Sequence, residues 1–321
     1  MGEELLIVDN LRTHFFTRRG IAKAVDGVSF AVGKGETLGL VGESGCGKSI
    51  TLFSILRLVP EPAGRIVGGK ILLEGENLLE KSLKEIRKIR GKKIAMIPQD
   101  PMTSLDPAFS VGSQLSETIK FHQHLRGAEV KNAATELLRM VRIPSPEDRL
   151  RSFPHQMSGG MKQRVAGGLA LSCQPILLLA DEVTSALDVT IQAEYLALLK
   201  EIQQQLEAGL IFVTHDFGIV EHMCDKVAVM YAGKIVEEAP VRELFDSPRH
   251  PYTVALMRSV PKVEEKRERL VGIQGQPPPL YELPPGCSFL PRCNAGSRRC
   301  EVDPPSVMVK EGHRVSCWQY F

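Results

Sequence analysis

The chain has 321 residues, with 40 basic against 38 acidic side chains and 43% hydrophobic residues. This length fits one large domain plus a smaller one, and the balanced charge argues against a surface that coats nucleic acid. The N-terminus lacks the layout of a secretory signal, and no uncharged apolar run approaches the roughly 20 residues of a membrane helix. We therefore expect a cytosolic protein that reaches a membrane only through partner subunits.

Two alternating segments open the chain, at 4–16 and 24–32, and predict a pair of strands joined by a turn at 18–20. An aromatic residue of the first segment, Phe15 or Phe16, is placed either to stack on an adenine or to pack as a core or edge side chain. An apolar run then predicts a buried strand over 36–41, and the run from Ser49 to Val59 predicts a helix.

Between this strand and helix lies the pattern G-x-x-x-x-G-K-[ST], in the strand–loop–helix setting of phosphate-binding loops. Glycines let successive N–H groups turn toward phosphate, and the helix N-terminus favours negative charge. Lys48 would reach the β- and γ-phosphates, and the Ser49 hydroxyl would ligate Mg²⁺. We predict a nucleoside triphosphate site formed by Gly42, Glu43, Ser44, Gly45, Cys46, Gly47, Lys48, Ser49 and Ile50.

The segment that follows mixes short strands with helices. Residues 60–69 indicate a break, and 70–75 and 94–97 predict strands. The basic run 81–93 has apolar residues at helical spacing, which favours an amphipathic surface helix over a nucleic-acid patch. Residues 100–150 predict a separate helical lobe, clearest at 128–141. Ser158, Gly159, Gly160 and Met161 then open a helix that runs to 172.

Two further apolar strands end in polar residues. The strand predicted at 176–180 leads into Asp181 and Glu182, which fit Mg²⁺ binding and the activation of water, respectively. The strand predicted at 210–214 leads into His215, a residue type that by itself is more often structural.

In this order, the motifs resemble those of the nucleotide-binding subunit of ABC transporters. They are residues 42–49, Gln99, 158–161, the acids 181–182, 185–188 and His215. The resemblance implies an α/β fold: a RecA-like P-loop ATPase core with an antiparallel β subdomain and an inserted helical subdomain at about 100–172. It places an ABC ATPase domain at 1–260 and a small, Cys-containing C-terminal extension at 261–321.

The resemblance implies catalytic roles for four residues. Glu182 would be the general base, and His215 would contact the γ-phosphate. Lys48 would hold phosphate, and Gln99 would sense the γ-phosphate and contact a transmembrane partner.

It also implies how ATP and Mg²⁺ are held. Phe15 would stack on the adenine, and Mg²⁺ would be bound by Ser49, Gln99 and, through water, Asp181. The signature formed by Ser158, Gly159, Gly160 and Met161 would complete the site of an opposing subunit, so that two ATP molecules lie between two such domains.

Two positions depart from the family pattern. Met161 stands where many relatives have Gln, a variation found in the peptide-importer branch. Val183 follows Glu182 where Pro is usual, which could loosen the loop before Asp188 and slow hydrolysis. Because both acids remain, we expect this chain's own site to hydrolyse ATP.

The tail resembles the C-terminal extension of dipeptide/oligopeptide importer ATPases at 249–253, 276–285 and 286–293, and residues 99–107 resemble the same group. The resemblance implies an energy-coupling ATPase at the cytoplasmic face of the cell (inner) membrane. Its partners would be a second, different ATPase subunit, two transmembrane permease subunits and, indirectly, an extracytoplasmic substrate-binding protein, without nucleic acid. Nickel, glutathione or oligosaccharide import stays open, and a soluble non-transport ABC ATPase is the more remote alternative.

Four of the seven cysteines crowd into this tail: Cys287, Cys293, Cys300 and Cys317. In a Pro-rich, weakly apolar cytosolic segment they could bind a [4Fe–4S] cluster or Zn²⁺, or remain thiols or disulfides. Tight C-x₂₋₄-C pairs typical of zinc ribbons are absent, and some relatives carry an iron–sulfur cluster here, so we expect the cluster. His313 could replace one ligand, although we expect a solvated side chain.

Overall fold

The computed structural model describes residues 4–100, 104–185, 187–259 and 272–321. The chain forms two compact units, which are described separately below. One contains Gly33–Glu36 and Lys81–Ile211, and the other contains Glu4–Val32, Thr37–Glu80 and Phe212–Phe321. Within the described ranges, no helix is both long enough and apolar enough to cross a bilayer.

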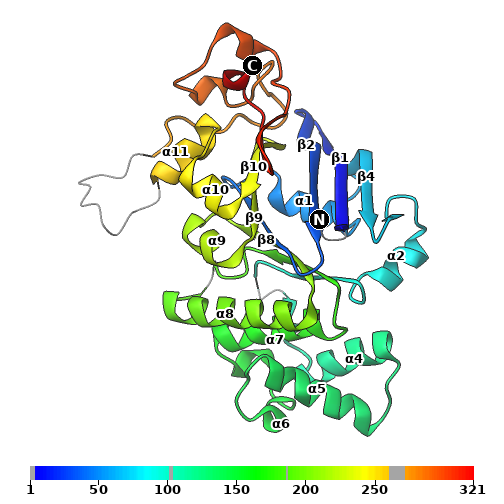
Figure 1. Ribbon diagram of the computed structural model, residues 1–321. Coiled ribbons are helices and arrows are strands. Elements are labelled where there is room, and N and C mark those ends of the chain that lie inside the picture. The colour runs from blue at the N-terminus through cyan, green and yellow to red at the C-terminus, as the bar shows by residue number, and fades with distance from the viewer. Residues whose placement is uncertain (1–3, 101–103, 186, 260–271) are drawn as a thin grey trace. The chain divides into compact units, whose positions relative to one another are not determined.

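The second unit begins with an antiparallel sheet of order β2-β1-β4-β5 (Figure 1). Its first two strands confirm the predicted pair, because the turn at 18–19 joins them and alternate residues such as Leu6 and Val8 are buried. The strands are β1 (Glu4–Thr17), β2 (Gly20–Gly33), β4 (Gly64–Leu73) and β5 (Glu76–Asn77).

A second group of strands in this unit includes β3, which the phosphate-loop motif follows directly in the sequence. Strand β3 is buried at every residue and pairs in parallel with β9, which explains its continuous apolar sequence. Antiparallel pairing then continues from β9 to β10, β12 and β11. The strands are β3 (Thr37–Val41), β9 (Lys226–Tyr231), β10 (Lys234–Pro240), β11 (Val307–Lys310) and β12 (His313–Val315). The helices of the unit are α1 (Lys48–Ile55), α9 (Phe217–Met223), α10 (Val241–Asp246) and α11 (Pro251–Ser259).

The first unit is mainly helical. Two of its helices begin with side-chain caps, from Ser158 to the Met161 N–H and from Asp188 to the Ile191 N–H. Strands β6 (Ile94–Ile97) and β7 (Leu177–Asp181) pair in parallel, and β8 (Gly209–Thr214) begins in this unit and ends in the other. The helices are α2 (Leu83–Ile89), α4 (Val111–Gln123), α5 (Ala128–Met140), α6 (Pro146–Arg149), α7 (Gly159–Leu171) and α8 (Val189–Leu206).

Several predicted bounds were wrong, among them the start of β4 and the end of α1. Strand β4 begins at Gly64 rather than 70, because its backbone pairs with β1 as far as Phe15 opposite Gly64 and does not need apolar side chains there. Helix α1 ends at Ile55, and a turn with Arg57 at φ 52° follows before Pro60, so the apolar run to 59 is only partly helical.

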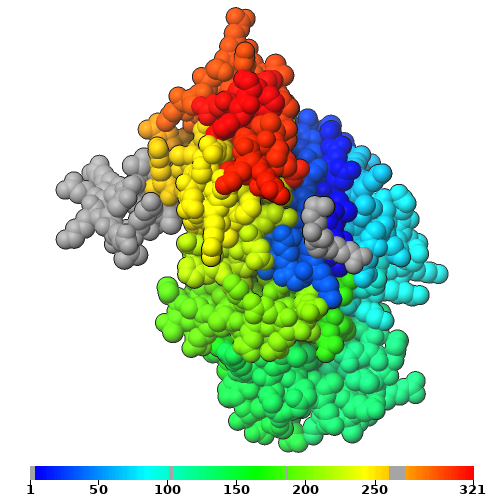
Figure 2. Space-filling view, in the orientation of Figure 1, coloured from blue at the N-terminus to red at the C-terminus, as the bar shows by residue number. Residues whose placement is uncertain are grey.

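The C-terminal extension is joined to β10 through a buried carboxylate. Glu237, 1% exposed, accepts hydrogen bonds from the backbone N–H groups of Arg249 (2.6 Å) and His250 (2.9 Å) and from His313 Nε2 (2.8 Å). The expectation that His313 is solvated was therefore wrong, because β12 pairs with β10 and carries the ring into the interior. Figure 2 shows the extension, in orange and red, covering part of the yellow segment that contains α10 and α11.

Replacing Glu237 should loosen this attachment. Glu237→Ala leaves three donors without their acceptor, two of them buried, so we expect the free energy of unfolding to fall by about 3 kcal/mol. Urea denaturation followed by tryptophan fluorescence measures this, because Trp318 lies in the extension. Glu311→Ala, in the exposed turn before β12, is the matched control. Equal free energies of unfolding for the two variants would contradict the role of Glu237 in attaching the extension.

Candidate nucleotide site and cysteine pocket

The backbone of the phosphate-loop motif lies so close to neighbouring strands that two of its positions admit only glycine. A Cβ on Gly42 would come within 2.2 Å of the Met230 carbonyl oxygen, and one on Gly47 within 2.1 Å of the Ala24 carbonyl oxygen. Both residues have positive φ, 153° and 112°, and Gly47 is the N-cap of α1. The loop therefore has the compact backbone that a phosphate cradle requires.

Lys48 begins α1 and is almost fully buried, with its ammonium group inside the loop. Its Nζ donates to the carbonyl oxygens of Gly42 (2.7 Å) and Glu43 (3.1 Å) and lies 3.9 Å from Cys46 Sγ. The chain thus holds one fixed positive charge at the centre of the loop. Burial raises the pKa of the Cys46 thiol, so this side chain stays protonated beside the lysine.

Glu43 is held by two side chains that are distant from the loop in sequence, those of Arg292 and Tyr252. Its carboxylate accepts two hydrogen bonds from Arg292, at 2.6 Å from Nη1 to Oε2 and 3.0 Å from Nη2 to Oε1. Its backbone N–H donates to the Tyr252 hydroxyl at 2.9 Å. No sequence signal could have paired these residues, because Arg292 follows Glu43 by 249 positions.

The remaining loop residues and Phe15 are also placed by the structure. Ser44 and Gly45 are exposed at the tip, while Ser49 and Ile50, in the first turn of α1, are half-buried. Phe15 lies on β1 with its ring against Gly64, where a Cβ would come within 2.8 Å of Phe15 Cε1. The ring is half-buried, so the choice between adenine stacking and edge packing stays a prediction.

In the other unit, Gln99 and Glu182 meet at the carboxyl end of two parallel strands. Ile97 of β6 lies opposite Ala180 of β7, so the residues that follow each strand reach the same edge. Gln99 Nε2 donates to Glu182 Oε2 at 3.0 Å. Asp181 closes β7 and is 4% exposed.

Glu182 adopts a left-handed backbone with φ 44°, which is uncommon for a residue with a side chain. Turn hydrogen bonds follow from the Ser185 N–H to the Glu182 carbonyl and from the Leu187 N–H to the Thr184 carbonyl. Val183, between Glu182 and Thr184 in the sequence, is 1% exposed. Its buried side chain occupies the position where the family pattern has proline.

The signature residues occupy the start of α7 in the same unit. Ser158 is exposed and caps the helix by accepting from the Met161 N–H at 3.3 Å. A Cβ on Gly160 would come within 2.8 Å of Ile191 Cγ2, so this glycine lets α7 approach α8. Gly159 has open space around its Cα. His215, exposed after β8, belongs to the other unit.

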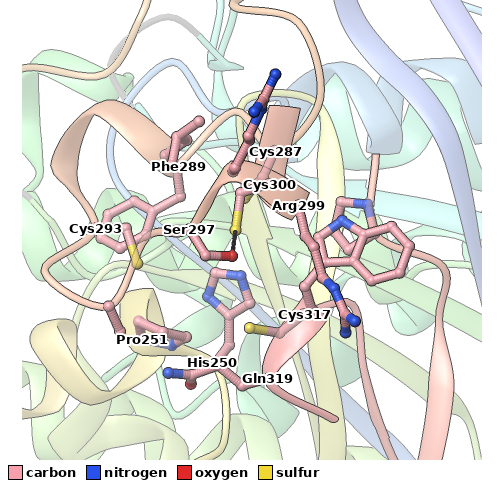
Figure 3. Close-up of a pocket in the computed structure, with 15 residues that line it drawn as sticks. His250, Pro251, Cys287, Phe289, Cys293, Ser297, Arg299, Cys300, Cys317 and Gln319 are labelled. Carbon is pink, nitrogen blue, oxygen red and sulfur yellow. Dashed lines mark hydrogen bonds between the residues drawn. The ribbon is translucent and has the colours of Figure 1, made fainter. Parts of the chain in front are cut away.

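The four cysteines of the extension line a single cavity of about 460 Å³ (Figure 3). Cys287, Cys293, Cys300 and Cys317 share its wall with His250. Within the part of the chain that the structure describes, no three His, Cys, Asp or Glu side chains converge closely enough to hold a single metal ion. The four thiols therefore line a cavity and do not converge on a position where one metal ion could bind.

Burial disfavours the charged form of three of these thiols. Burial, with a smaller contribution from repulsion by the other three cysteines, raises the pKa of Cys287 to about 11. Burial also raises the pKa of Cys293 and Cys317. Without a bound cation, Cys287, Cys293 and Cys317 are thiols rather than thiolates at neutral pH.

Comparison with known families identifies two parts of the chain. Residues 25–185 match the ABC transporter family, and residues 236–300 match the oligopeptide/dipeptide transporter C-terminal region.

Several named relatives match nearly the whole chain. A probable peptide ABC transporter ATP-binding protein of Sinorhizobium fredii is 49% identical, over 98% of this chain and 95% of that protein. The oligopeptide transport ATP-binding protein AppD of Bacillus subtilis is 45% identical, over 98% and 97%. The dipeptide transport ATP-binding protein DppD of Escherichia coli is 44% identical, over 98% and 96%.

Solved structures agree with this similarity. A dimeric post-hydrolysis ATP-binding cassette bound to ADP and phosphate has a TM-score of 0.66 at 26% identity, covering 74% of this chain and 99% of that one. A cassette of Clostridium perfringens that is part of an ABC transporter complex has a TM-score of 0.65 at 27% identity, covering 76% and 92%. The chain therefore belongs to the ATP-binding subunits of ABC transporters, in the branch with the oligopeptide/dipeptide transporter C-terminal region.

Proposed function

We propose that this chain is the ATP-hydrolysing subunit that drives an importer of dipeptides or oligopeptides. The observation that carries the proposal is the joint match of the ABC transporter family and the oligopeptide/dipeptide C-terminal region, together with near full-length relatives named for peptide transport. The C-terminal region also makes a soluble, non-transport ABC ATPase a poor alternative. The chain would bind permease subunits at the cytoplasmic face of the membrane as a peripheral protein.

ATP would be held mainly by the loop at 42–49. Lys48 presents its ammonium group to the β- and γ-phosphates, and the loop N–H groups surround them. Ser49 and Gln99 would bind the Mg²⁺ ion that accompanies ATP through side-chain oxygen atoms, and Asp181 would bind it through water. Phe15 stacks on the adenine.

Glu182 would take the proton from the attacking water. The hydrogen bond from Gln99 orients its carboxylate, and His215 contacts the γ-phosphate as the water attacks. The proton passes to the Glu182 carboxylate, and the bond between the γ-phosphorus and the bridging oxygen of ADP breaks.

The opposing surface would come from a second ATPase subunit. The solved cassette dimer bound to ADP and phosphate is a precedent for pairing of this kind. In this chain, Ser158, Gly159, Gly160 and Met161 would face the nucleotide of the partner. We propose that the partner is a different chain, and that a substrate-binding protein delivers peptide to the permease.

We further propose that the cysteine pocket holds a [4Fe–4S] cluster. Such a cluster takes one thiolate at each of four separated iron corners, which suits four thiols around a cavity better than a single Zn²⁺ ion does. Cys287, Cys293, Cys300 and Cys317 would be its ligands. When bound, it would supply a cross-link to a segment with little apolar core.

The loop glycines offer a matched test of the nucleotide site. Gly47→Ala would put its Cβ against the Ala24 carbonyl oxygen, whereas Gly45→Ala has no atom within 4 Å of the new Cβ. Both carry backbone strain of about 1–3 kcal/mol, so the difference between them isolates the clash. We expect Gly47→Ala to weaken MgATP binding at least about tenfold more than Gly45→Ala, by calorimetric titration. Equal affinities would contradict the proposed cradle.

Glu182→Gln should abolish proton transfer while keeping the side chain's shape. In an assembly whose partner site is disabled, we expect the hydrolysis rate to fall about 10²- to 10⁴-fold with MgATP binding retained. Glu129→Gln, on the exposed face of α5, should leave the rate unchanged. An unaltered rate in Glu182→Gln would refute its role as the general base.

Metal analysis tests the cluster separately. Anaerobically purified chain should contain about four iron atoms and four acid-labile sulfides, and Cys287→Ser should lose most of them. Cys173→Ser, outside the pocket, should retain the wild-type content. A colourless, iron-free wild-type preparation would eliminate the cluster.

A further inference from the structure

The C-terminal extension reaches the phosphate loop through one arginine. Arg292 ends a short 3₁₀ turn of the extension, Leu290–Arg292, and its side chain is 4% exposed. Its guanidinium forms a bidentate ion pair with the Glu43 carboxylate. Pairs of this geometry fix orientation as well as distance, because two parallel N–H···O bonds define a plane.

The guanidinium is itself fixed from other directions. Its Nε donates to the Gln274 carbonyl oxygen at 3.0 Å, and Nη1 donates to the Tyr231 hydroxyl at 3.3 Å. Its Cζ lies 5.8 Å from the ring centre of Tyr231 and 5.9 Å from that of Phe289. Arg292 is therefore a rigid contact rather than a surface side chain that meets Glu43 by chance.

Glu43 connects Arg292 to other residues of the phosphate loop through its own hydrogen bonds. Its carboxylate is held by Arg292, its N–H by the Tyr252 hydroxyl, and its carbonyl oxygen accepts from Lys48 Nζ and from the Cys46 N–H (3.3 Å). The residue that receives Arg292 thus also binds the lysine that is placed for phosphate. A shift of Glu43 would move both the loop backbone and the Lys48 ammonium group.

We propose that Arg292 is a positioning residue for the nucleotide site: through Glu43 it fixes the phosphate loop, so that ATP affinity depends on the docked C-terminal extension. The inference rests on the proposed binding of ATP at residues 42–49. Cys293 follows Arg292 directly in the sequence and lines the cysteine pocket. A cysteine of the pocket is therefore the sequence neighbour of the residue whose side chain contacts Glu43 of the phosphate loop.

The test compares MgATP binding and hydrolysis by full-length chains. Arg292→Gln should raise the Kd and the KM for MgATP about tenfold, with a smaller change in kcat, because the variant alters the loop and not the groups that act on water. Arg292→Lys keeps the charge but cannot form two parallel hydrogen bonds with the Glu43 carboxylate. Its affinity for MgATP should therefore lie between those of Arg292→Gln and the wild type.

Two further comparisons separate positioning from general stability. Lys234→Gln breaks another ion pair to the extension, with Asp303 at 2.7 and 2.8 Å, and should leave ATP affinity unchanged. If Arg292 acts through Glu43, the double variant Glu43→Gln/Arg292→Gln should bind MgATP no more weakly than Glu43→Gln alone.

The outcomes are distinct. Wild-type affinity in a folded Arg292→Gln or Arg292→Lys chain would overturn the inference and leave the proposed function standing. Additive losses in the double variant would also overturn it, since Arg292 would then act elsewhere. A wild-type chain that binds no MgATP would contradict the proposed function itself, and the inference with it.

Discussion

The structure of the nucleotide site depends on the close approach of one backbone loop to its neighbours. Gly42 and Gly47 lie against the carbonyl oxygens of Met230 and Ala24 at distances that exclude any Cβ. This packing turns the loop tightly enough for the Lys48 ammonium group to sit among its carbonyl oxygens. The same compactness brings Glu43 within reach of Arg292 and so connects the loop to the C-terminal extension.

Polar groups secure the extension alongside the buried ring of Phe289. Glu237 collects three donors in the interior, one of them from His313, and Arg292 pairs with Glu43 beneath Tyr231 and Phe289. Buried groups of this kind are costly unless every partner is present, so they favour one docked arrangement over many. The cysteine pocket lies within this segment, and a bound cluster would add covalent restraint to the polar contacts.

Much of the fold could be predicted from local pattern. Continuous apolar runs marked β3 and β7, and Ser158 marked the start of α7, because burial on both sheet faces and helix capping leave local signals. The start of β4 could not be predicted, since its first residues are held by pairing with β1. His313 and Arg292 were missed as contacts because their partners, Glu237 and Glu43, are distant in sequence and nothing local specifies them.

Coupled hydrolysis measures directly whether this ATPase serves peptide import. The chain would be assembled in lipid vesicles with its permease and partner ATPase, and ATP hydrolysis measured with the substrate-binding protein empty or loaded with a dipeptide or oligopeptide. We expect the peptide-loaded binding protein to stimulate hydrolysis. A rate that is the same with empty and loaded binding protein, in an assembly that hydrolyses ATP, would contradict it.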